Sequence, residues 1–125
     1  MANETPFDKS ITGRPLRQEE GALIRFLLAG LYSPEILDPI LKDSRVTDLQ
    51  DGGMGSIRFV GGGPSKFSNE MVEAQYRDRD DVLVSIAINS GDHGELFELD
   101  FWKVDFSPLK RYPNPSDVFS VSRNR

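Results

Sequence analysis

Hydrophobic positions along the chain follow two different periods. Between residues 18 and 41 apolar side chains recur every three or four residues, which aligns them on one face of a helix. From residue 45 to residue 106 apolar and polar residues alternate, as they do in strands with one buried face. The pattern therefore predicts helices in the first part of the chain and strands in the middle part.

Two helices are predicted. The first covers residues 18–29, with acids in its first turn, where the helix dipole favours negative charge, and Gly30 at its end. The second starts at residues 33–35, which supply a cap, a proline at the first helical position and an early acid. Pro39 lies inside it, which predicts a kink or a restart. The short connection favours a helical hairpin. The stripe expected to meet the sheet consists of Leu23, Leu27 and Leu31.

Glycine-rich and acidic turns divide the alternating region into five strands. Residues 51–55 and 78–81 each join two strands as a hairpin, 61–64 break the chain, and 90–94 precede a last strand over 96–106. The spacing leaves no room for crossover helices, so the strands should be antiparallel. The predicted fold class is α+β, with two N-terminal helices packed on a roughly five-stranded antiparallel sheet.

The last strand changes phase along its length. Phe97, Leu99 and Phe101 alternate with acids, whereas Trp102 and Val104 fall on the other phase. A β-bulge between Phe101 and Trp102 would return the second half to the inward face, and the alternative is that both faces are covered there. Large apolar strands are an aggregation hazard at a sheet edge, so this strand is expected near the centre. Trp102 is expected in the core.

Composition limits the class of protein. The chain has 125 residues, 38% of them apolar, and no cysteine, which excludes disulfides, thiolate metal sites and thiol nucleophiles. Its length suits one domain over 1–125, with a loose arm over 1–13 and an extended C-terminal tail over 107–125. The apolar stretches are shorter than the ~20 residues of a membrane span. The chain is therefore predicted to be cytoplasmic, with no membrane partner; its oligomeric state stays open.

Negative charge is concentrated in the strands. The formal net charge is -5, and residues 70–105 hold ten acids against three bases. Such a block repels nucleic-acid phosphates and attracts cationic proteins, so a cationic protein partner is predicted and nucleic acid is not. Glu73, Glu98 and Asp100 should share one sheet face, with two acidic turns at its rim. The candidate partner-binding residues are Glu73, Asp78, Asp80, Asp81, Asp92, Glu95, Glu98 and Asp100. A solvated strand face is the simpler interpretation.

No motif predicts a cofactor or a metal site. The glycines of residues 61–66 lack the order of a phosphate loop and the helix that should follow it. The single histidine, His93, lies in a turn and cannot make a transition-metal site alone. Clustered carboxylates could hold Mg²⁺ or act as acid and base. An enzyme is therefore not favoured, and a small-molecule or divalent-metal-dependent enzyme stays the alternative function.

Three segments of the chain carry a resemblance: Arg14-Pro15-Leu16, residues 51–56 (DGGMGS) and residues 95–109 (ELFELDFWKVDFSPL). They resemble a family of small, uncharacterised bacterial cytoplasmic proteins, and the resemblance covers roughly residues 14–112. It implies bacterial origin and a compact domain, and it implies no activity. Small acidic bacterial proteins of this kind are often immunity proteins encoded beside toxins, an argument by class. The predicted function is a protein-binding module, an immunity or antitoxin protein that docks an acidic surface over the active site of a toxin encoded nearby.

Overall fold

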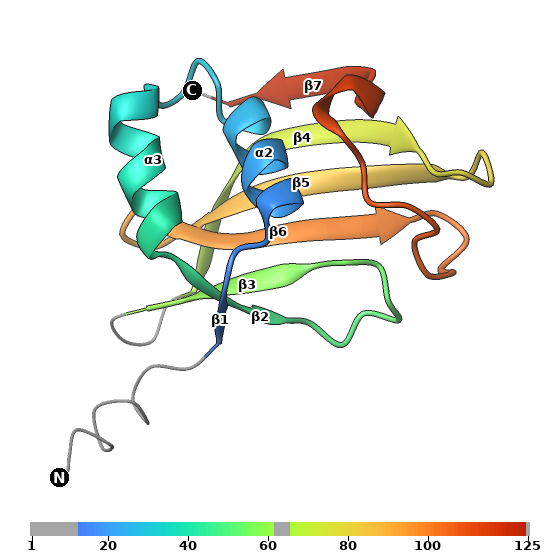
Figure 1. Cartoon of the computed structure of the whole chain (residues 1–125), viewed down its shortest axis with the longest axis horizontal. Coiled ribbons are helices and arrows are strands. Elements are labelled where there is room, and N and C mark those ends of the chain that lie inside the picture. Colours follow the sequence, from blue (N-terminus) through green and yellow to red (C-terminus); the bar gives the residue numbers. More distant parts are fainter. Residues whose placement is uncertain (1–12, 62–65, 125) are drawn as a thin grey trace, which may run out of the picture.

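A computed structural model describes residues 13–61 and 66–124 (Figure 1). Residues 1–12 of the arm predicted over 1–13, and residues 62–64 of the break predicted at 61–64, lie outside the described residues. The helices are α2 (Gln18–Leu27) and α3 (Pro34–Asp43), with a short 3₁₀ helix η1 (Pro115–Asp117). The strands are β1 (Arg14–Pro15), β2 (Arg45–Asp48), β3 (Ile57–Val60), β4 (Phe67–Arg77), β5 (Leu83–Gly91), β6 (Leu96–Lys103) and β7 (Ser120–Arg123).

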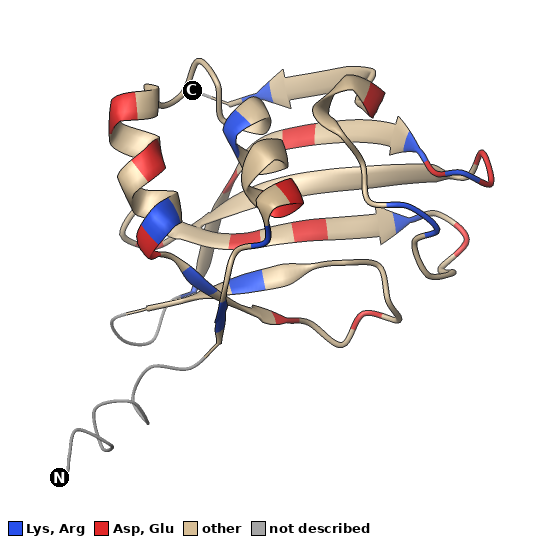
Figure 2. Ribbon diagram, in the orientation of Figure 1, with Lys and Arg blue, Asp and Glu red and all other residues tan. Residues whose placement is uncertain are grey.

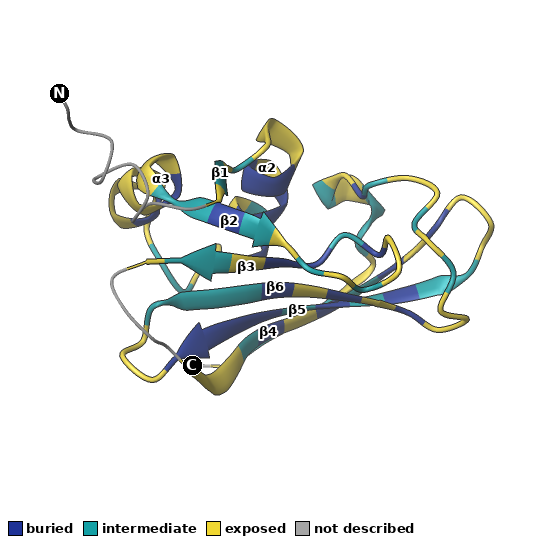
Figure 3. Ribbon diagram, turned by 90° about the horizontal axis from the view of Figure 1, so that it is seen from below, coloured by how far each residue is buried: buried dark blue, intermediate teal, exposed yellow. Residues whose placement is uncertain are grey.

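The described strands form one antiparallel sheet in the order β1-β2-β3-β6-β5-β4-β7. Figures 1 and 3 show both helices on the same face of this sheet. The α+β class is therefore confirmed, but the expected number of five strands is wrong, because the sheet has seven. The additional strands, β1 and β7, form the two edges. β1 has two residues, too few to show a period, and the four residues of β7 lie in the segment predicted as an extended tail.

The two helices differ only slightly from the expected segments. Gly30 adopts φ 88° just beyond α2, as a left-handed stop does. Pro39 lies inside α3 without dividing it, so the expected restart is wrong. Pro39 lacks the N–H that would donate to the carbonyl of Glu35 one turn earlier. Because Glu35 is exposed, water can donate a hydrogen bond to that carbonyl instead. The Nε of Arg25 donates to Asp38 at 2.8 Å and links the two helices.

The strand of large apolar residues, β6, is the fourth of the seven strands and is central, as expected. The expected bulge between Phe101 and Trp102 is wrong, since the ladder to β5 continues unbroken through both residues. The irregularity lies at the other end of β6, between Asn89 and Ser90 of β5. Trp102 consequently points away from the helices and is 54% exposed, so its expected place in the core is also wrong.

The core lies between α2 and the inward face of the sheet. Leu23 and Leu27 are fully buried there, while Leu31 is only partly buried against the same cluster. The sheet contributes inward-facing residues from β2 to β6, which are Val46, Ile57, Val72, Ala74, Tyr76, Val84, Ile86, Ile88, Leu99 and Phe101. The period-two pattern of the sequence therefore predicts correctly which side chains of the central strands are buried.

The tail beyond residue 107 docks along the sheet. It passes through η1 and ends in β7, which pairs with β4. Arg123 reaches from β7 to the end of α2 and donates to the carbonyls of Leu27 and Phe26 at 2.8 and 2.9 Å. Carbonyls at a helix C-terminus have no partner inside the helix. Arg123 therefore supplies a donor to the Leu27 carbonyl and a second donor to the Phe26 carbonyl, which also accepts the N–H of Ala29 at 3.3 Å.

Shortening Leu27 tests the helix–sheet packing. Leu27→Ala is expected to lower the free energy of unfolding by about 2 to 5 kcal/mol, because it leaves a cavity in a closed core. Ile36→Ala is the matched control, since Ile36 also lies on a helix but is 57% exposed, and its effect should stay within about 0.5 kcal/mol. Urea denaturation measures both; equal losses would contradict the packing.

Candidate functional site

The face of the sheet opposite the helices, called here the open face, is covered by no helix or loop of the described chain (Figure 3). In β6, the residues Glu98, Asp100 and Trp102 point to it, because the residues between them are buried. The sequence predicts that Glu73 shares this face with the two β6 acids. The strand register agrees with this prediction, because Glu73 lies opposite Ala87 and Ala87 lies opposite Asp100.

Two neighbouring rows of side chains cross the open face from β6 to β7. One row consists of Trp102, Ser85, Gln75 and Ser120, and the next of Asp100, Ala87, Glu73 and Ser122. The rows are about 7 Å apart along the strands, and β6 and β4 are about 10 Å apart across β5. Small residues on β5 therefore separate larger side chains on β6 and β4, and Trp102 lies directly beside the acidic row.

The three acids of the open face differ in their partners. Arg58 of β3 donates to Glu98 through Nε at 2.9 Å, and the Glu98 side chain is 15% exposed. Asp100 accepts a hydrogen bond from the Ser56 hydroxyl at 3.1 Å. Partial burial, together with the charges of Glu98 and Asp51, raises the pKa of Asp100 despite that hydrogen bond. Among the described residues Asp100 and Glu73 form no ion pair, so no described cation neutralises these two carboxylates.

Asp78 lies inside the protein rather than at the rim of the open face. It is 5% exposed, and its carboxylate accepts the Lys103 ammonium at 2.8 Å. It also accepts the backbone N–H groups of Arg79, Lys110 and Arg111 at 2.7, 2.7 and 3.0 Å. Four donors thus satisfy this carboxylate, and it is enclosed by the fold.

Lys103 is the centre of this buried cluster. The side chain is fully buried, and its three donors meet Asp78, Asp80 at 2.7 Å and the carbonyl of Pro108 at 3.1 Å. Burial lowers the pKa of Lys103, but the two carboxylates outweigh it and hold the pKa above its usual value. The Lys103 cluster, made of Lys103, Asp78, Asp80 and residues 108–111, ties the β4–β5 turn and the tail to the end of β6.

The second acidic turn lies at the other end of β5. A strand of nine residues separates the two turns, which is roughly 30 Å, so a partner would have to span the sheet to touch both. Asp81 is exposed in the first turn at φ 66°. In the second turn Asp92, His93 and Glu95 are exposed or nearly so, and their ligand atoms lie within 4.8 Å of one another. Within the described residues this is the group that could take a cation, and Glu73, Glu98 and Asp100 do not form one.

Comparison with known proteins places the chain in a family. Residues 13–113 match the model of a domain of unknown function, DUF6984. The chain belongs to this family. No curated protein and no solved structure matches it. The resemblance to an uncharacterised family is thereby confirmed, while bacterial origin stays a prediction.

The matched region of this DUF6984 domain contains β1 to β6 and the whole Lys103 cluster, and it ends before η1 and β7. Neither helix of the described chain has the length and apolar character that a membrane crossing requires. Sequence reasoning missed the Lys103 cluster because a lysine in an alternating strand is normally a solvent-facing residue. The change of phase in the hydrophobic pattern at Trp102 was the one signal of a buried lysine in the sequence. Neighbouring side chains of a strand point to opposite faces, so an outward Trp102 requires an inward Lys103.

Removing the Lys103 ammonium tests the cluster. Lys103→Met leaves Asp78 without its buried counter-ion, so the midpoint of thermal unfolding should fall by roughly 10 °C. Lys110→Met is the control, because Lys110 is exposed and uses only its backbone N–H in the cluster. If the two variants have the same melting temperature, Lys103 does not hold the tail and the turn in place.

Acid titration tests the charge on Asp78. Burial raises its pKa, but the hydrogen bonds from Lys103 and from the backbone outweigh burial and leave the pKa below its usual value. The unfolded chain therefore takes up the proton first, so this carboxylate stabilises the fold above about pH 4 and ceases to do so as pH falls through the lowered pKa. The stability difference between wild type and Asp78→Asn should narrow between about pH 5 and pH 2. Urea denaturation at several pH values measures it; a constant difference would contradict an ionised Asp78.

Proposed function

We propose that this DUF6984 domain is a protein-binding module whose open face receives a basic surface of a partner. The observation that carries the proposal is Trp102, which is 54% exposed on a central strand beside Asp100 and Glu73. Tryptophan is among the residues that contribute most binding energy when an interface buries them.

A second aromatic ring, in the turn that follows β6, packs against Trp102. The ring of Phe106 lies 6.2 Å from the ring of Trp102, and Phe106 is 68% exposed. Phe106 adopts φ 63°, a left-handed conformation that a bulky residue rarely adopts. Such conformations cost on the order of 1–3 kcal/mol and concentrate at binding sites. The strained turn keeps a second aromatic ring at the surface next to Trp102.

The chemistry of the open face suits a lysine or arginine side chain. A cation can lie over the face of an indole ring, where the interaction strengthens as water is excluded. Asp100 is two residues from Trp102 on the same face, about 7 Å along the strand, and Glu73 lies across Ala87. A basic side chain can therefore contact the ring and one of the carboxylates together.

Within this class we propose an immunity or antitoxin protein that acts in the cytoplasm. Its open face would cover the basic residues with which a toxin binds an anionic substrate. The net charge of -5 supports fast association with such a partner, and the association should slow as salt rises. Of the residues expected from the sequence, Glu73 and Asp100 form the centre of this contact. Glu98 supports it through Arg58, and Asp80, Asp81, Asp92 and Glu95 lie at its two ends.

Binding to the product of a neighbouring gene tests the proposal. Calorimetry should show Trp102→Ala weakening the complex by about 2 kcal/mol, roughly 30-fold. The pair Glu73→Lys and Asp100→Lys should slow association and reverse its salt dependence. Glu98 is left intact, because reversing it would also disturb Arg58.

Asp43→Lys provides the matched charge control. Asp43 is exposed at the last position of α3, on the helix side of the sheet, where a lysine also suits the helix dipole. This variant should bind as the wild type does. A neighbour that is not a toxin would contradict the immunity function. A toxin whose binding survives all three open-face changes would contradict the open face as the docking surface.

A further inference from the structure

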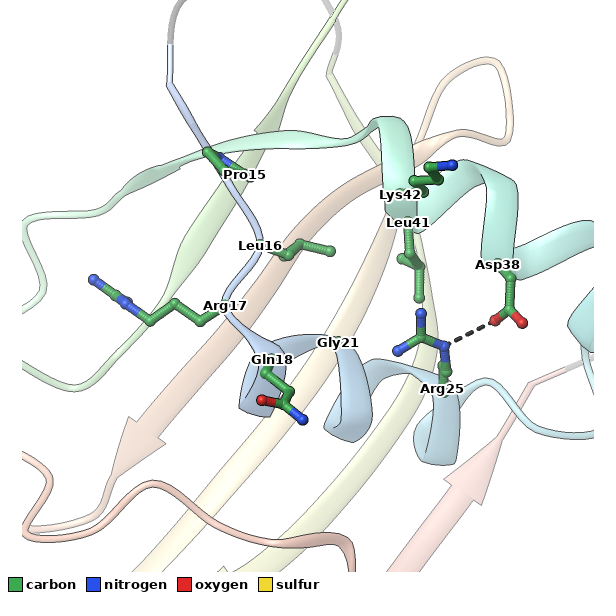
Figure 4. Close-up of a pocket in the computed structure, with 9 residues that line it drawn as sticks. All are labelled: Pro15, Leu16, Arg17, Gln18, Gly21, Arg25, Asp38, Leu41 and Lys42. Atoms are coloured by element: carbon green, nitrogen blue, oxygen red, sulfur yellow. Dashed lines mark hydrogen bonds and ion pairs between the residues drawn. The ribbon is translucent and has the colours of Figure 1, made fainter.

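A pocket of about 440 Å³ lies on the helix side of the protein, away from the open face (Figure 4). It is bordered by β1, by one side of α2 from Gln18 to Arg25, and by the second half of α3. Its apolar lining includes Leu16 and Leu41, and its charged lining consists of Arg17, Arg25, Lys42 and Asp38. Three basic residues thus meet one acid in a protein whose net charge is -5.

Arg25 lies at the border of this pocket, where its side chain is 50% exposed and paired with Asp38. Its Nε donates to Asp38 at 2.8 Å across the two helices, and Figure 4 shows its guanidinium directed toward Leu41. The guanidinium lies over Gly21, where a Cβ would come within 3.1 Å of Nη1. Both terminal nitrogens of Arg25 lack a hydrogen-bond partner among the described residues. The free edge of a pre-oriented guanidinium therefore faces the pocket.

The other basic residues have different roles. Arg17 is paired with Glu20 at 3.3 Å, and Figure 4 shows its side chain leaning away from Arg25. Lys42 lies one residue beyond Leu41 at the rim, where its ammonium adds a second positive charge. Because Asp38 neutralises one charge through Nε, the pocket keeps an excess of positive charge beside an apolar lining.

We propose that this pocket binds a small organic anion, in which one carboxylate or phosphate group is attached to an apolar body. The two terminal nitrogens of Arg25 match the paired oxygens of either group, the geometry in which arginine binds oxyanions most strongly. Lys42 contributes charge, and the apolar body packs on Leu16 and Leu41. The site is independent of the open face, which lies on the other side of the sheet.

Titration with hexanoate, hexyl phosphate and acetate tests the proposal. Nuclear magnetic resonance of the ¹⁵N-labelled full chain should show saturable shifts at Arg25, including its Nε–H, and at Gly21 and Lys42. Hexanoate should bind at least tenfold more tightly than acetate, because its four extra methylenes are at least partly buried against the apolar lining. Saturation by hexanoate alone or by hexyl phosphate alone would identify the preferred anion. Absence of saturation with both would overturn the site.

Three variants separate the site from general charge attraction. Arg25→Gln should weaken binding at least tenfold. Gly21→Ala should weaken it severalfold with no fall in the melting temperature, because the added methyl displaces the guanidinium while alanine favours the helix. Lys110→Gln, an exposed charge at the far end of the protein, should leave binding unchanged. Equal weakening by Lys110→Gln and Arg25→Gln, or full binding by Arg25→Gln, would overturn the proposal.

Discussion

The buried ion pair between Lys103 and Asp78 is the constraint on which the rest of the structure depends. Neighbouring side chains of a strand point to opposite faces, so an inward Lys103 requires an outward Trp102. The cluster also fixes the turn between β4 and β5 and the start of the tail, through the backbone N–H groups that Asp78 accepts. The Lys103–Asp78 ion pair thus links β6, the β4–β5 turn and the tail inside the protein, and it leaves Trp102 on the outer face of the sheet.

A second ion-pair network lies at the edge of the sheet that β1 forms. Arg14 of β1 donates to both oxygens of the buried Glu20 carboxylate at 2.9 Å and to Asp48 of β2 at 2.7 Å. Glu20 also accepts the backbone N–H of Arg17 at 2.7 Å, so one carboxylate caps α2 and anchors β1. The approach of β1 to β2 requires glycine before it, since a Cβ at Gly13 would lie 2.6 Å from the carbonyl oxygen of Val46.

The two sides of the sheet offer different binding chemistry. Figure 2 shows acids along β4 and β6, each of which ends in a base, and a mixture of acids and bases on the helices and the edge segments. The open face combines exposed aromatic rings with acids, which suits a basic macromolecular surface. The helix side contains a concave pocket with excess positive charge, which suits a small anion. Because the sheet separates the two surfaces, occupation of one leaves the other accessible.

The sequence by itself determined the features that depend on local periodicity. Apolar spacing placed Leu23 and Leu27 on the buried side of a helix, and alternation placed Glu73, Glu98 and Asp100 on one face, because strand geometry repeats every two residues. Only the tertiary structure decided the burial of Lys103 and Asp78, the exposure of Trp102 and the pairing of Glu98 with Arg58. Lys103 and Asp78 are 25 positions apart and Glu98 and Arg58 are 40 apart, and no local pattern shows that such partners will meet. A lone lysine or carboxylate belongs in water, and its burial becomes favourable only when the fold supplies the opposite charge and the remaining hydrogen bonds.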